Sequence, residues 1–160
     1  MDAYKQEIIM LVTAAIATLG YAILFRLKPS RLSFAVIGGL VATVVYLVMR
    51  GLVENIFVIN FVAAVAATVY SEICATCLKA PTTVFLLPSA IPLVPGSALY
   101  WTMDGLLQND VEGFLSYAKV ASQTGLGIAL GIMMASLGAV IARRAAHSLR
   151  TDKGDGSKSK

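Results

Sequence analysis

Glu72 is the residue whose type and position most strongly suggest chemistry. It lies in an apolar stretch long enough to cross a membrane, where a carboxylate is costly and usually faces the interior of a helix bundle. Small and polar residues recur at every fourth position around it, which places them in one stripe on a helix. The stripe consists of Asn60, Ala64, Thr68, Glu72 and Thr76. It predicts a polar seam lining a cavity, in which Glu72 binds an ammonium group or carries a proton. Alternatively, Glu72 lies close enough to Lys79 for its side chain to extend to water at the membrane surface.

The second candidate is the apolar segment of residues 88–100, which contains three prolines and a glycine within nine residues. Proline lacks a backbone N–H and clashes with the preceding turn, so a regular helix must stop and restart here. In lipid, such a break survives only where protein or a water-filled cavity covers it. A helix restarting at Ser97 would present unpaired amides at the positive end of its dipole, which suits a carboxylate.

The break therefore supplies the other half of a predicted substrate site. Carbonyl groups freed between Pro88 and Pro92 suit an ammonium group or a cation, and the hydroxyls of Ser97 and Tyr100 add polar contacts. Asp104, one turn beyond Tyr100, either lines an exit path or marks the end of the span. The alternative for the whole segment is a simple kink. The candidate substrate-binding residues are Asn60, Thr68, Glu72, Pro92, Pro95, Gly96, Ser97 and Tyr100.

Few residues suit catalysis or metal binding. Cys74 and Cys77 form a lone CxxC pair with no second pair or nearby histidine, which favours two small buried thiols over a metal site. The single histidine, His147, lies in the basic tail. We therefore expect no catalytic residues, no metal ion and no cofactor, and the protein is not predicted to be an enzyme.

The composition places these residues in a membrane. Of the 160 residues, 58% are hydrophobic and 14% are charged, and the mean hydropathy is +0.78. A soluble domain has about 45–50% apolar and about 25% charged residues. The net charge of +4 does not indicate nucleic acid, because the cations lie at the ends of apolar segments and in the tail. We expect the chain to contact the lipid bilayer, and we expect it to bind no nucleic acid.

The apolar segments predict an all-α polytopic membrane helix bundle with five transmembrane spans, the fourth broken by proline and glycine. The predicted spans are residues 8–25, 32–49, 55–78, 82–107 and 121–142, within a membrane domain of residues 1–150. Residues 108–119 are predicted to be interfacial, and residues 151–160 a disordered cytoplasmic tail. Small residues at four-residue spacing in the last span predict close helix packing. They are Gly127, Gly131, Ala135 and Ala139.

The cations predict the orientation. Five crossings place only Lys5, Arg50 and Lys119 on one side. The other side receives Arg26, Lys28, Arg31, Lys79, Arg143, Arg144, Arg150, Lys153, Lys158 and Lys160. The positive-inside rule puts the larger group in the cytoplasm, so the N-terminus is expected outside and the C-terminus inside. A fourth segment that re-entered without crossing would put the basic tail outside, so a full crossing is favoured.

Residues 91–96, Ile-Pro-Leu-Val-Pro-Gly, together with Tyr100, resemble the threonine/serine exporter family. The likeness is closest to the small five-span subunit type of a split two-component exporter. Residues 25–39, the region from Glu72 to Pro81 and the Gly-rich last span are also similar, so the resemblance covers nearly the whole chain. Ser97 departs from the motif, because another glycine is frequent there.

The resemblance implies a secondary exporter in the cell inner (plasma) membrane that works with a larger membrane subunit of the same family. Its implied substrates are threonine and serine, or a dicarboxylate such as succinate. We therefore predict the small subunit of an exporter for small carboxylate-bearing metabolites, whose two inverted halves rock around the site. The alternatives are a non-transporting assembly subunit, whose partner holds the site, and a homo-oligomeric channel.

Overall fold

The computed structural model describes the backbone of residues 2–155 and the side chains of residues 4–144. Within that range the chain is helical and contains no strand, which confirms the predicted all-helical fold. The helices are α1 (Asp2–Leu24), α2 (Pro29–Leu52), α3 (Ile56–Leu78), α4 (Thr83–Ala90), the 3-10 helix η1 (Ile91–Leu93), α5 (Gly96–Leu107) and α6 (Val111–Asp155).

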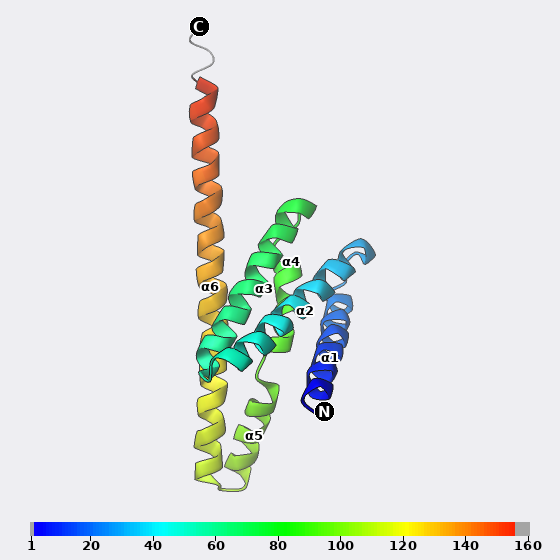
Figure 1. Cartoon of the computed structure of the whole chain (residues 1–160), viewed down its shortest axis with the longest axis vertical. Helices are drawn as coiled ribbons and strands as arrows, with labels where there is room; N and C mark the ends of the chain where they lie inside the picture. Colours follow the sequence, from blue (N-terminus) through cyan, green and yellow to red (C-terminus); the bar gives the residue numbers. More distant parts are fainter. Residues whose placement is uncertain (1, 156–160) are drawn as a thin grey trace.

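Four helical segments are long and apolar enough to cross a membrane: residues 4–24, α2, α3 and residues 111–144. The pair formed by residues 83–93 and α5 passes the same test with a bend of 53° between its two parts. The part of the chain that the structure describes therefore has four or five candidate spans, consistent with the predicted polytopic bundle. In Figure 1, α4, η1 and α5 together run from one end of the bundle to the other.

The helix ends follow from local sequence. Pro29 occupies the first turn of α2, where its missing N–H costs nothing. The Asn55 side chain caps α3 by accepting a hydrogen bond of 3.0 Å from the Phe57 amide. The turns after α1, α3 and α5 each contain a left-handed residue, which redirects the chain after its last helical turn. These residues are Arg26, Lys79 and Asn109.

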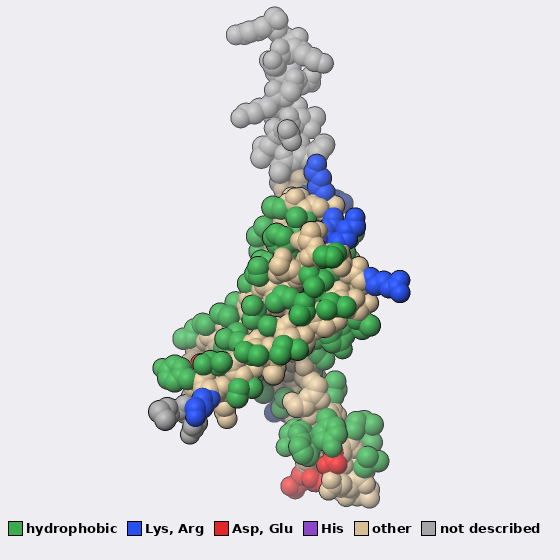
Figure 2. Space-filling model, turned by 90° about the vertical axis from the view of Figure 1, so that its right-hand side faces the viewer, with side chains coloured by type: hydrophobic (Ala, Val, Ile, Leu, Met, Phe, Trp, Pro, Cys, Tyr) green, Lys and Arg blue, Asp and Glu red, His purple; other side chains and the backbone are tan. Residues whose placement is uncertain are grey.

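Successive helical segments run antiparallel, so their connections alternate between two ends of the bundle (Figure 1). The α1–α2 and α3–α4 turns lie at the end toward which α6 rises, and the N-terminus and the α2–α3 and α5–α6 turns lie toward the other. Figure 2 shows most of the visible Lys and Arg side chains over the first end, and a group of acidic side chains at the opposite end. The segment formed by α4, η1 and α5 therefore connects a mainly basic end of the bundle to an acidic one.

Glycines set how closely the helices approach. A Cβ atom added to Gly131 of α6 would lie 2.6 Å from the Phe61 carbonyl oxygen of α3 and 2.9 Å from the Ala64 Cβ atom. A Cβ atom added to Gly127 would lie 2.7 Å from the Phe57 carbonyl oxygen. The first two residues of the predicted small-residue ridge thus pack directly on α3, whereas Ala135 and Ala139 line a groove. In α2, Gly38 and Gly39 similarly make room for side chains of α4 and α1.

The segment predicted to be interfacial, residues 108–119, forms the α5–α6 turn and the start of α6. Gly105 of α5 approaches the backbone of Phe114 so closely that an added Cβ atom would lie 2.8 Å from its nitrogen. Trp101 stacks on Tyr117 with ring centroids 6.2 Å apart. α5 and the start of α6 therefore form an antiparallel hairpin. α6 continues to Asp155, beyond the point where disorder is predicted, and residues 156–160 lie outside the described range.

Candidate functional site

The break between η1 and α5 has a defined backbone path. After η1, Val94 is extended, with φ −62° and ψ 128°, and α5 begins at Gly96. The Gly96 amide donates to the Val94 carbonyl oxygen at 2.8 Å, and the Leu99 amide donates to that of Pro95 at 3.0 Å. Between them, the amides of Ser97 and Ala98 have no acceptor among the described residues, and no side chain caps α5. The start of α5 thus keeps the unpaired donors that the sequence predicts.

The first half of the break is covered by protein. Leu93 packs in a buried cluster with Ala42 of α2 and with Ala63, Ala64 and Ala67 of α3. This cover is the condition under which irregular backbone is tolerated at membrane depth. The Leu93 cluster also fixes the level of the break along α3, near residues 63–67.

Pro92 lines a cavity of about 190 Å³ between the break and the first two helices. The other lining residues come from α1 and α2, and include the hydroxyl-bearing Thr13 and Thr43. The complete lining is Met10, Thr13, Ala14, Ala17, Thr43 and Pro92. The structure therefore places the open side of the break against α1 and α2. The sequence pattern predicted instead that the polar stripe of α3 lines the site.

Ser97 and Tyr100 lie on the exposed face of α5, away from the lining of the Pro92 cavity. Tyr100 is 64% exposed and packs edge-on against Trp101, with ring centroids 5.2 Å apart. α5 has substantial contacts only with α6 among the described helices. The structure consequently does not bring these hydroxyls together with Glu72.

Asn60 and Thr68 are buried, and each satisfies its hydrogen bonding within α3. The Asn60 side-chain amide donates to the Ile56 carbonyl oxygen at 2.8 Å, and the Thr68 hydroxyl donates to that of Ala64 at 2.7 Å. Asn60 and Ala64 pack against Gly127 and Gly131. This part of the stripe is therefore a helix–helix contact and not a cavity wall, because small residues permit close packing as readily as they line a cavity.

Glu72 forms an ion pair with Arg143 of α6, a partner that the sequence reasoning did not identify. Arg143 also donates to the Thr76 hydroxyl at 3.1 Å. The Glu72 side chain is 15% exposed and that of Arg143 is 55% exposed. The only signal in the sequence was that both residues belong to the same basic end of the predicted bundle.

The Glu72–Arg143 pair lies in a groove of about 560 Å³ between α3 and α6. No residue of the broken segment lines it, but Cys77 does, and Cys77 is exposed while Cys74 is buried. Glu72 is five to nine residues beyond the level of Leu93, which corresponds to about 8–14 Å along α3. Glu72 thus lies closer to the basic end of the bundle than the break does. This position agrees with the alternative in which the Glu72 side chain extends toward water near Lys79.

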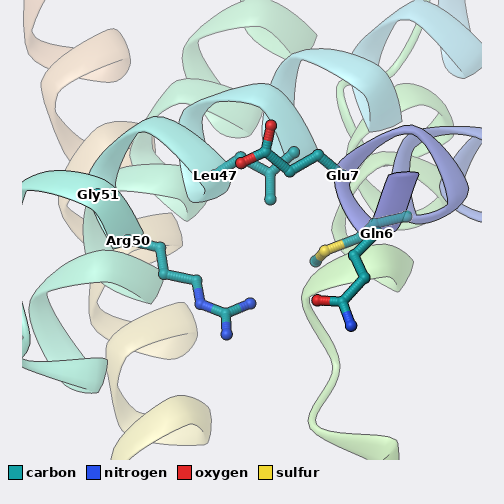
Figure 3. Close-up of a pocket in the computed structure, with 6 residues that line it drawn as sticks. Gln6, Glu7, Leu47, Arg50 and Gly51 are labelled. Atoms are coloured by element: carbon teal, nitrogen blue, oxygen red, sulfur yellow. The ribbon is translucent and has the colours of Figure 1, made fainter. Parts of the chain in front are cut away.

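A third cavity, of about 330 Å³, opens where α1 begins and α2 ends. Glu7 and Arg50 extend toward it from opposite helices, and Gln6 lies beside them (Figure 3). Its lining residues are Gln6, Glu7, Met10, Leu47, Arg50 and Gly51. Met10 also lines the Pro92 cavity, so the two cavities share this side chain. In the sequence, Glu7 and Arg50 are indistinguishable from ordinary flanking charges.

The Glu72–Arg143 pair allows a stability prediction. Glu72→Gln and Arg143→Gln should each lower the free energy of unfolding by about 1 kcal/mol or less, because Arg143 is more than half exposed. Combining the two substitutions should cost less than the sum of the single effects, since both remove the same interaction. Thermal unfolding of the four proteins in detergent measures this coupling. Strictly additive effects would contradict a direct interaction.

Residues 10–137 match the family described as threonine/serine exporter, ThrE. The chain belongs to the threonine/serine exporter family. The match extends from α1 through the break into α6 and covers most of the chain, so it includes the Pro92 cavity and Glu72. No curated protein and no solved structure matches the chain. This exporter-family membership and the apolar helices identify a multi-pass membrane protein of threonine/serine exporter type, in a family of transporters.

Proposed function

We propose that this protein is the small subunit of a split exporter that moves small carboxylate-bearing metabolites out of the cell. Threonine and serine, or a dicarboxylate such as succinate, are the proposed substrates. The observation that carries the proposal is the broken fourth crossing, in which two unpaired amides open α5 beside a covered, irregular backbone. Such broken helices hold substrates in several transporter folds.

In the proposed mechanism, the amides of Ser97 and Ala98 bind the substrate carboxylate at the positive end of the α5 dipole. Pro92, Pro95 and Gly96 keep these donors free by preventing a continuous helix. The Pro92 cavity would hold the substrate's remaining donor groups. Its Thr13 and Thr43 hydroxyls donate within their own helices and therefore offer acceptor oxygens to a ligand. The Asn60 and Thr68 side chains support the site by fixing α3, since both bond within that helix.

We assign Glu72 to the route between the cytoplasm and the break. Its pairing with Arg143 links α3 to α6 at the basic end, about 8–14 Å along α3 from the level of Leu93. Protonation of Glu72 would remove the negative charge that holds Arg143, and would thereby loosen the α3–α6 groove. This role couples a proton to opening without direct contact between Glu72 and the substrate.

The proposed partner is a larger membrane subunit of the same family. α5 has substantial contacts only with α6, and Tyr100 and Trp101 on its surface are exposed. A second subunit seated beside α5 would enclose the amides that open it. The proposed location is the cell inner membrane, with the basic end in the cytoplasm and the N-terminus outside, as the positive-inside rule requires.

The test is efflux of preloaded threonine, serine and succinate from cells that express this chain, the larger subunit, or both. We expect efflux of at least one substrate only when both are present at normal levels. Export by the larger subunit alone would contradict the proposal and leave this chain as an assembly subunit. Conductance of liposomes containing this chain alone would instead indicate a homo-oligomeric channel.

A further inference from the structure

The cavity between the start of α1 and the end of α2 combines opposite charges in an unusual way. Glu7 and Arg50 line the same space, yet they form no ion pair with each other or with any other described side chain. Figure 3 shows the carboxylate and the guanidinium separated across the opening, with the Gln6 amide beside them. The floor is apolar and consists of Met10 and Leu47.

We propose that this cavity is a binding site for a small zwitterion, a molecule that carries an ammonium group and a carboxylate close together. Glu7 binds the ammonium group, Arg50 binds the carboxylate, and Gln6 adds a neutral hydrogen bond. A dicarboxylate fits poorly, because its second carboxylate would face Glu7. The further statement that the zwitterion is transported substrate rests on the function proposed above, whereas its binding here does not.

The charges and the size of the cavity support this assignment. Arg50 lies in the last turn of α2 and has no ion-pair partner among the described side chains, so its guanidinium is available to an anionic ligand. Charge-assisted hydrogen bonds are about twice as strong as neutral ones, and a guanidinium can hold a carboxylate through two of them. A volume of about 330 Å³ is at the lower end of the range of about 300–1,000 Å³ for ligand pockets, which suits a small metabolite.

The position of the cavity gives the site a role in transport. Met10 lines both this cavity and the smaller one beside Pro92. A substrate released from the break toward α1 and α2 would pass Met10 and reach Glu7 and Arg50. The cavity is therefore the last binding site before the substrate leaves at the end of the bundle that carries the N-terminus.

Equilibrium binding to the full chain in lipid nanodiscs tests the site with L-serine and two analogues that each lack one charged group. Ethanolamine lacks the carboxylate, and 3-hydroxypropionate lacks the ammonium group. Glu7→Gln should weaken serine binding by about 10-fold and leave 3-hydroxypropionate unaffected. Arg50→Gln should weaken serine binding by about 10-fold and leave ethanolamine unaffected.

Lys5→Gln is the matched control, because Lys5 is an exposed charge on the same helix that does not line the cavity. We expect it to bind serine as the wild-type protein does. Equal losses for all three ligands in the Glu7 and Arg50 variants would indicate a structural effect and overturn the site, as would undiminished serine binding in both. The measurement is repeated in a protein carrying Pro92→Ala and Pro95→Ala. Loss of efflux with retained, Glu7-dependent serine binding there would separate this site from the break.

Discussion

Gly131→Ala should destabilise the folded protein by about 1–3 kcal/mol, because the added methyl group meets backbone and not a movable side chain. Its Cβ atom would lie 2.6 Å from the Phe61 carbonyl oxygen and 2.9 Å from the Ala64 Cβ atom. Relief requires α3 and α6 to move apart along their shared contact. Thermal unfolding in detergent should show a lower midpoint, and the yield of folded protein should fall.

Gly138→Ala is the control for this substitution. Gly138 lies in the same helix, and a Cβ atom added there has no other atom within 4 Å. Since alanine favours helix over glycine by about 1 kcal/mol, this variant should be as stable as wild type or more stable. Equal behaviour of the two variants would mean that α6 does not approach α3 closely at Gly131.

The double substitution Pro92→Ala and Pro95→Ala should abolish most transport while leaving the protein folded. Both changes restore a backbone N–H and remove a ring clash, so η1 and the start of α5 can join the α4 helix. The Ser97 and Ala98 amides would then donate to the carbonyl groups of Leu93 and Val94. With both donors lost to the substrate, we expect efflux to fall by about 10-fold or more.

The thermal stability of the double variant shows whether lost efflux reflects a lost substrate site or an unfolded protein. Proline costs about 3 kcal/mol in a helix interior, so the double variant should not unfold more easily than wild type. Pro81→Ala, in the exposed turn between α3 and α4, changes a proline outside the break and should leave efflux unchanged. Normal efflux from the double variant, at normal protein levels, would exclude the break as the substrate site.

The helical fold and the break between α4 and α5 were predictable because their causes are local. Scarcity of charge defines a lipid-facing segment without reference to any other segment, and the prolines at 88, 92 and 95 interrupt a helix wherever it packs. The alternation of the connections between two ends of the bundle was predictable as well, because short turns join antiparallel helices. Which end faces the cytoplasm stays a prediction.

Contacts between distant segments were not predictable in the same way. Glu72 and Arg143 are separated by 71 residues, and many cations share the predicted basic end, so no pattern selects one partner. The stripe from Asn60 to Thr76 was ambiguous for a different reason. A repeat of small and polar residues is typical of a cavity wall and equally of a close helix contact, and only the glycines of α6 decide between them.

The continuous α6 helix has a mechanical consequence. Its 45 residues correspond to a rod of about 68 Å, more than twice the hydrocarbon thickness of a bilayer. It approaches α3 closely at Gly131, so a tilt of α6 relative to α3 would pivot near that contact. Arg143 lies about 18 Å from that point on one side, and the α5 hairpin contact begins about 30 Å away on the other. A tilt about that contact that moves the α5 end of α6 would displace Arg143 in the opposite direction, by roughly 0.6 of the distance. Such a tilt would couple the broken segment to the Glu72–Arg143 ion pair.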